Sequence, residues 1–150
     1  MTKVIDGPDV QIRGMVEGWI EALRAKNVEN RTGDYAPDVV LFDVIGPFQH
    51  VGLEALRARL TEWFSTFRGP IDCEVRDLHI TAGDDVAFCH SLNRFRGSLK
   101  DGGQLEMWVR FTVCLCKIDS RWTVTHEHAS VPFDVETGRA SIDIAPSGLS

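Results

Sequence analysis

The second half of the chain constrains the fold most, because it reads as long strands joined by very short turns. Apolar and β-branched residues predict strands at 72–82, 85–97, 104–118 and 121–132. Gly, Asp and Ser residues mark the turns between them, at 83–84, 101–103 and 119–120. Antiparallel strands can be joined by turns this short, whereas parallel strands need a long crossover. We therefore expect a run of antiparallel strands.

The first half predicts two amphipathic helices, at 9–26 and 53–67, around one strand at 38–45. Residues 28–34 are polar and predict a short turn of helix or a loop. The apolar stripe of the first helix comprises Val10, Met15, Trp19 and Leu23, with Val16 and Ile20 beside them. Helices followed by a run of strands predict an α+β domain, with the helices on one face of a bent sheet.

Composition narrows the possible partners and compartments. With 16 basic and 22 acidic residues the net charge is -6, which disfavours binding to a nucleic-acid backbone. No apolar stretch approaches the ~20 residues of a membrane span, and residues 1–9 lack a signal-peptide core. The four cysteines lie in apolar, strand-like runs and are expected to be buried free thiols. We expect one cytoplasmic domain over 1–150, with its core at about 10–133 and a C-terminal tail at 134–150.

Four stretches carry a resemblance to a known family, namely YAPDVVLFD (35–43), GLEALR (52–57), WVRFT (108–112) and WTVTHEHAS (122–130). Together they resemble the SnoaL-like branch of the nuclear transport factor 2-like superfamily. The resemblance implies a cone-shaped fold, in which N-terminal helices pack on a curved sheet and enclose a pocket. The last stretch is also similar to the end of the calcium/calmodulin-dependent kinase II association domain.

A second similarity, to ketosteroid isomerase, concerns one carboxylate. In that enzyme a Tyr-Ala-Asp-Asp stretch precedes the catalytic base, which lies five residues beyond its last acid. Here Asp38 ends the stretch that begins at Tyr35, and Asp43 follows five residues later. The resemblance therefore implies that Asp43 is a general base. The isomerase's oxyanion hole is formed by a tyrosine and a protonated aspartic acid, which correspond here to Trp19 and Val113. Trp19 has no hydroxyl and Val113 is apolar, so steroid isomerisation by that route is not expected.

Strand alternation and the isomerase analogy together predict the pocket lining. The inward sets are Phe88, His90, Leu92 and Arg94; Val109, Phe111, Val113 and Leu115; and Thr123, Thr125, Glu127 and Ala129. The predicted catalytic residues are Asp43, His90 and Glu127. The predicted substrate-binding residues are Trp19, Phe88, Arg94, Phe111, Val113 and Thr125. Trp122, Val124, His126, His128 and Ser130 are predicted to face outward, and an interface role for the two histidines is weighed against metal binding.

These residues suggest two main classes of function, beside a third hypothesis, the hydration of a small molecule such as carbon dioxide or an epoxide. The first is a binder of a small hydrophobic or aromatic molecule, or an enzyme of the isomerase, dehydratase or cyclase type that uses acid–base chemistry without a cofactor or metal. The second is a non-catalytic oligomerisation or ligand-sensing domain, as the kinase II resemblance implies. A homodimer through the outer sheet face is expected, with no nucleic-acid or membrane partner.

Overall fold

The computed structural model describes residues 7–147 and contains three helices and six strands in that range. The helices are α1 (Pro8–Arg24), α2 (Val28–Thr32) and α3 (Leu53–Ser65). The strands are β1 (Tyr35–Phe42), β2 (His50–Val51), β3 (Asp72–Ala82), β4 (Val86–Ser98), β5 (Gln104–Ile118) and β6 (Arg121–Ser130). The predicted α+β class and the order of its long elements are confirmed.

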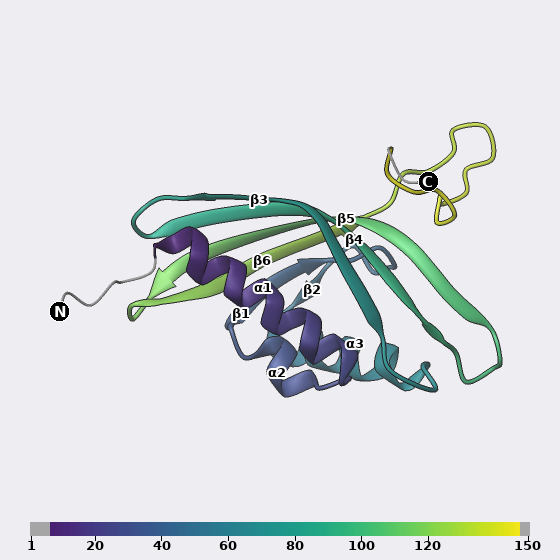
Figure 1. Ribbon diagram of the computed structural model, residues 1–150, viewed down its shortest axis with the longest axis horizontal. Coiled ribbons are helices and arrows are strands. Elements are labelled where there is room, and N and C mark those ends of the chain that lie inside the picture. The colour runs from purple at the N-terminus through teal and green to yellow at the C-terminus, as the bar shows by residue number, and fades with distance from the viewer. Residues whose placement is uncertain (1–6, 148–150) are drawn as a thin grey trace.

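All six strands form one sheet in the order β2-β1-β6-β5-β4-β3. β1 runs parallel to β6, and the other neighbouring pairs are antiparallel, including the predicted run from β3 to β6. Figure 1 shows the sheet curving over the helices, which lie on its concave side. The core fills the space between α1 and this inner face of the sheet.

The apolar stripe of α1 explains how this helix packs. Ile12, Val16, Trp19 and Leu23 recur at helical spacing and are all buried. Val10, which the sequence placed on the stripe, is instead 55% exposed because it lies on the opposite side of the helix. The helix therefore presents Trp19 and its neighbours to the sheet, where the largest core cluster forms.

The inner face of β4 differs from the sequence prediction by one residue. Cys89, Ser91 and Asn93 are buried, whereas Phe88 and His90 are exposed. The pairing with β5 gives the reason, because β4 and β5 pair without a register shift and Ser91 therefore lies opposite an inward residue of β5. A one-residue error in alternation moves every side chain to the other face. The prediction that Phe88, His90 and Arg94 point inward is therefore wrong.

A β-bulge in β6 changes its alternation midway. Leu115 of β5 pairs with Val124, but the preceding residue, Cys114, pairs with His126, so Thr125 is the extra residue. Glu127 faces inward as predicted and is buried, but Trp122 and Val124, predicted to face outward, are buried as well. Strict alternation fails here because a bulge exchanges the two faces of a strand. His126 and His128 lie on the outer face, as predicted.

A second bulge lies in β3, between Arg76 and His79. Asp77 takes a positive φ of 53° at this point, in the left-handed region that Asp tolerates better than most residues. The bulge turns Leu78 toward the inner side of the sheet, where it packs against the core. The strand edge nearest α1 is therefore bent.

Residues 131–147 form no helix or strand, and a single bridge joins Phe133 to Ala140. Figure 1 shows this segment extending away from the sheet. Among the described residues, no helix combines the length and apolarity needed to cross a bilayer.

Candidate binding cavity

A small cavity lies between α1 and the inner face of β3, β4 and β5. Its volume is about 30 Å³, enough for one or two water molecules. Apolar side chains form most of its wall, and five residues bring polar or sulfur atoms to it. The apolar residues are Val16, Trp19, Ile20, Leu23, Val75, Leu78, Phe95, Phe111 and Val113, and the others are Arg31, Cys73, Cys89, Ser91 and Asn93.

Arg31 is the charged residue of this wall and is buried. It comes from α2, a short helix whose first turn is capped by the Asn27 side chain, which accepts from the Asn30 amide. Its Nη1 donates to the Tyr35 hydroxyl at 2.6 Å, and its Nη2 lies 3.3 Å from Glu127 Oε1. The remaining nitrogen, Nε, is buried and has no hydrogen-bond partner within the described part of the chain. The Nε–H of the guanidinium is therefore a free donor.

Tyr35 and Glu127 hold Arg31 in its charged form. Burial alone would lower the pKa of the guanidinium, but its interactions with Tyr35 and with the Glu127 carboxylate, including hydrogen bonds to both, outweigh it and hold that pKa above its ordinary value. Burial also raises the pKa of Tyr35 well above its ordinary value. The phenol therefore stays protonated and donates a hydrogen bond to Glu127 Oε1. The group as a whole is a neutralised ion pair, which explains how a charge can lie in the core.

Trp19 connects this ion pair to α1. The Arg31 guanidinium carbon lies 5.1 Å from the centroid of the Trp19 ring, a cation–π distance. The indole Nε1 donates to Asp34 Oδ2 at 3.2 Å, which fixes the orientation of the ring. Trp19, predicted to bind substrate, therefore lines the cavity and also shields Arg31.

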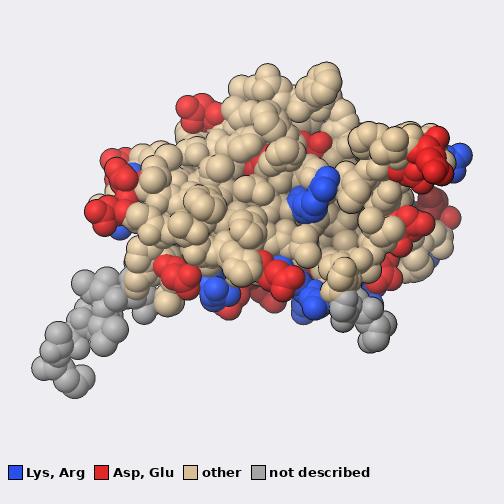
Figure 2. All heavy atoms as spheres, turned by 90° about the horizontal axis from the view of Figure 1, so that it is seen from above, with Lys and Arg blue, Asp and Glu red and all other residues tan. Residues whose placement is uncertain are grey.

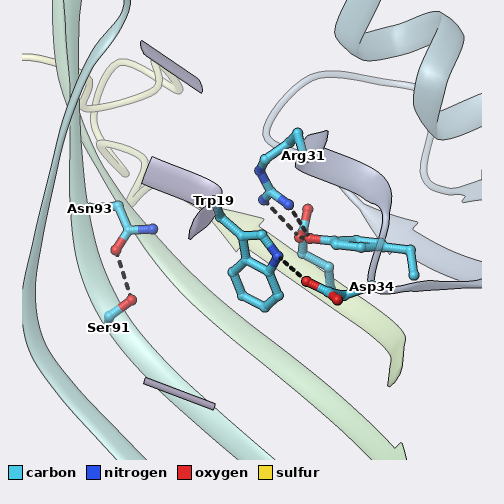
Figure 3. A network of polar contacts seen from close by, with 7 residues as sticks. Trp19, Arg31, Asp34, Ser91 and Asn93 are labelled. Carbon is cyan, nitrogen blue, oxygen red and sulfur yellow. Dashed lines mark hydrogen bonds and ion pairs between the residues drawn. The ribbon is translucent and has the colours of Figure 1, made fainter. Parts of the chain in front are cut away.

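The opposite wall carries a second polar pair, on β4. The Ser91 hydroxyl donates to Asn93 Oδ1 at 2.7 Å, and both residues are buried. Figure 3 shows this pair on one side of Trp19 and Arg31 on the other, with the amide nitrogen of Asn93 turned away from Ser91. The cavity is therefore apolar, with polar groups from α2 and from β4.

The two cysteines of the wall are protonated thiols. Burial raises the pKa of Cys73 to about 12 and that of Cys89 to about 11. A thiol in this state is a poor nucleophile and a poor base at neutral pH.

Of the residues that the sequence predicted for the site, Trp19, Phe111 and Val113 line the cavity. Glu127 does not line the cavity but pairs with Arg31, which does. Thr125 occupies the bulge of β6, where its hydroxyl donates to the Cys114 carbonyl at 3.3 Å.

Asp43 lies at a different place. Its Oδ2 accepts from Arg59 Nε at 2.9 Å, and its Oδ1 accepts from the Val44 amide. It borders an open groove formed by residues 42–49 and His128, not the cavity. The structure therefore does not bring Asp43 together with the other predicted site residues.

The remaining predicted residues belong to the outer face of the sheet. His90 stacks against His79 with ring centroids 5.2 Å apart. Arg94 pairs with carboxylates at the sheet surface, including Glu74 at 3.4 Å. Phe88 is 46% exposed.

His126 and His128 pack against Phe42 on this outer face. The Nδ1 of His126 donates to the Val40 carbonyl at 2.7 Å, because a carbonyl oxygen can only accept. Within residues 7–147, no group of three or more His, Cys, Asp or Glu side chains is placed to hold a metal ion.

Comparisons with known proteins identify the family and the fold. Residues 12–134 match the SnoaL-like domain family. An NTF2-like protein of unknown function from Pseudomonas putida KT2440 is 32% identical, with a TM-score of 0.83, over 93% of this chain and 99% of that one. A comparison with curated proteins finds no match.

More distant structures share the fold alone. One is a candidate calcium/calmodulin-dependent protein kinase II association domain from Xanthomonas campestris, 20% identical with a TM-score of 0.74, over 90% of this chain and 97% of that one. Another is a ketosteroid isomerase-like protein from Erwinia carotovora atroseptica, 18% identical with a TM-score of 0.70, over 84% of this chain and 97% of that one.

Proposed function

The chain belongs to the SnoaL-like family, and we propose that its cavity between α1 and the sheet receives one end of a small, mainly apolar molecule. The observation that carries this proposal is the wall itself. Nine apolar side chains surround a buried guanidinium that keeps a free donor. A mainly apolar cavity with a few placed polar groups is the usual form of a small-molecule site.

The chemistry of the wall favours binding over acid–base catalysis. A base must be able to accept a proton at working pH. The ionisable groups on the wall are Arg31, whose pKa is raised, and the thiols of Cys73 and Cys89, whose pKa values are about 12 and 11. All three stay protonated near neutral pH. We therefore assign the cavity a binding function, in preference to the isomerase, dehydratase and cyclase classes.

The binding function can be tested by blocking the cavity. Leu78 lies on its partly exposed side, so Leu78→Trp would fill it, whereas Thr81→Trp adds the same ring on an exposed position of β3 outside the wall. Cyclopentane and cyclopentanone would be titrated into ¹⁵N-labelled protein while the Trp19 indole N–H resonance is followed. We expect saturable shifts in the wild type and in Thr81→Trp, and none in Leu78→Trp. Absence of saturable shifts in the wild type would overturn the proposal.

Acid–base catalysis in the cavity can be tested separately, by deuterium exchange. If the cavity removed protons from bound ketones, the protein would speed deuterium incorporation at the carbon next to the carbonyl of cyclopentanone in D₂O. We expect no acceleration. A protein-dependent rate that is lost in Leu78→Trp would instead favour an acid–base enzyme.

Self-association through the outer sheet face is a second candidate function. Phe42 and Phe88 on this face are 37% and 46% exposed. Figure 2 shows the molecule from the side of the sheet, with few charged side chains over a broad area and acidic groups at its edges. Exposed aromatic side chains on a face with few charged groups suit a second copy of the chain.

Light scattering measures this association. We expect a dimer in the wild type and a monomer in Phe88→Glu. Val10→Glu changes an exposed apolar residue of α1, on the helix side, and should leave the dimer intact. A wild-type monomer would contradict the proposal. Assemblies larger than a dimer would favour the association-domain alternative.

A further inference from the structure

Resting on the proposed self-association through the outer sheet face, we propose that the C-terminal segment, residues 131–147, packs on the outer sheet face of the second copy. The segment brings exposed apolar side chains and carboxylates, and the face brings aromatic rings and arginines without carboxylate partners. In a pair with twofold symmetry the contact is made twice, once by each segment.

The C-terminal segment is folded back on itself, but its apolar side chains are uncovered. The Asp134 amide donates to the Arg139 carbonyl at 2.8 Å, and the Ser141 amide donates to the Pro132 carbonyl at 2.7 Å. A turn of this size is marginally stable alone in water. A surface that covers its apolar side chains would stabilise it. Phe133 and Val135 are 66% and 85% exposed, and Ile142 and Ile144 are exposed as well.

The segment lies on the correct side of the sheet for this contact. Figure 1 shows it leaving the end of β6 and rising on the side of the sheet opposite to the helices. A second copy would lie on this side in the proposed pair. Facing sheets pack about 10 Å apart, whereas a segment of this length spans up to roughly 55 Å when extended and about half of that when folded back. It is therefore long enough to reach the facing sheet.

The centre of the outer face carries positive charge without compensation. Arg76 of β3, Leu92 of β4 and Arg110 of β5 lie in one row across the sheet. Within the described residues, neither arginine forms an ion pair with a carboxylate, and Arg76 Nη1 is buried without a hydrogen-bond partner. Other carboxylates of this face gather at one end, around Arg94 and Arg96; they are Asp72, Glu74 and Glu106.

The charge of the segment complements these arginines. A contact between two bare sheets would bring the arginines of both copies into one interface, and like charges across an interface are unfavourable. The segment carries three carboxylates, of Asp134, Glu136 and Asp143, against one base, Arg139. On the facing sheet it would bring negative charge to the arginines, while its apolar side chains cover exposed rings such as Phe88.

The apolar part of the contact is tested by sedimentation equilibrium. Replacing both Phe133 and Val135 by Ser should raise the Kd of the dimer at least about tenfold, because it removes an aromatic side chain from the contact. Val10→Ser changes an exposed apolar residue on the helix side and should leave the Kd within about twofold. All three positions are exposed in the folded chain, so circular dichroism should show the same fold in each variant.

The charged part of the contact is tested at equal net charge. Glu136→Gln with Asp143→Asn removes two carboxylates of the segment and keeps Asp134, which accepts the Glu136 amide in the turn. Glu17→Gln with Glu21→Gln removes two exposed carboxylates of α1, so it relieves the general repulsion between acidic copies equally. We expect the first variant to weaken the dimer about three- to tenfold, and the control to leave it unchanged or tighter. Equal effects would overturn the proposal.

Photocrosslinking locates the segment directly, without removing any contact that it makes elsewhere. Unlabelled protein with p-benzoylphenylalanine at position 135 is irradiated with an excess of ¹⁵N-labelled wild type, and the joined peptides are identified by mass spectrometry. We expect unlabelled peptides around position 135 joined to labelled peptides of β4 or β5. Crosslinks to α1 or α3, or only between two unlabelled peptides, would overturn the proposal.

The two proposals fail in different ways. A wild-type monomer overturns the proposed self-association and this inference with it. A wild-type dimer that dissociates in Phe88→Glu, but keeps its Kd in both segment variants, overturns the role of the segment alone.

Discussion

Gly97 of β4 lies against the ring of Phe67 so closely that a Cβ atom at position 97 would be 2.7 Å from Phe67 Cδ1. Phe67 is completely buried, and its ring packs against Trp63. We expect Gly97→Ala to lower the free energy of unfolding by about 1–3 kcal/mol, the usual cost of overpacking, as measured by urea denaturation. In contrast, Gly14→Ala in α1 meets no atom within 4 Å and should stabilise the helix by about 0.5–1 kcal/mol. Equal effects would contradict this packing.

Removing the charge of Glu127 should leave Arg31 uncompensated in the core. Glu127→Gln keeps the shape and an acceptor for Tyr35, but loses the charge. We expect it to lower the free energy of unfolding by about 3–5 kcal/mol, as for a broken buried ion pair. Glu106→Gln, which breaks a pair with Arg94 at the surface, should change it by no more than about 1 kcal/mol. Similar losses in both variants would show that the interior pair has no special role.

The buried thiols predict a loss of stability at high pH. The pKa of Cys73 rises from 9.0 to about 12 on folding, and that of Cys89 rises to about 11. A raised pKa means that the folded state holds the proton more tightly. The contribution is therefore complete below pH 9 and is lost as pH rises toward 12. Each thiol should add a slope of about 1.4 kcal/mol per pH unit within its window.

Urea denaturation between pH 7 and 11 measures this slope. Cys73→Ala should make the curve shallower above pH 9, because one raised pKa is removed. Cys116→Ala is a suitable control, since Cys116 is only partly buried. A curve that stays flat up to pH 11 in the wild type would contradict the prediction.

Asp43 should be dispensable for binding in the cavity. It pairs with Arg59 at the open groove and does not line the cavity wall. We expect Asp43→Asn to leave cyclopentanone affinity within about twofold of the wild type, while the loss of a charged hydrogen bond costs roughly 1–2 kcal/mol of stability. The same NMR titration measures the affinity. A large loss of cyclopentanone affinity would contradict this expectation and would support the role in the site that the sequence spacing of Asp43 predicted.

The elements of this fold could be predicted because their apolar periodicity is strong. The predicted strands at 72–82 and 104–118 agree with β3 and β5 in both bounds. The two-residue strand β2 was missed, since a pattern needs more than two residues to repeat. The family resemblance supplied the cone-shaped arrangement, which periodicity alone does not contain.

The faces of the strands were harder to predict than their positions. The alternation of inward and outward side chains along β6 fails at Thr125 because of a bulge, and no residue type at this position predicts a bulge. For β4 a signal was present. The turn at 101–103 pairs Ser91 with Phe111, and since Phe111 was placed inside, Ser91 and Asn93 could have been placed inside as well. Arg31 gave no signal, because it lies in a short polar stretch and owes its burial to Glu127, far along the chain.

That separation has a kinetic consequence. Arg31 of α2 and Glu127 of β6 are 96 residues apart, and β1, which follows α2, pairs in parallel with β6. The hairpins β3–β4, β4–β5 and β5–β6 close short loops and can form early. The β1–β6 pairing instead closes a loop of nearly two thirds of the chain and is slow to form. A nascent chain still lacking β6 would expose an unpaired Arg31. Ligand binding in the cavity would therefore report that the last strand has docked.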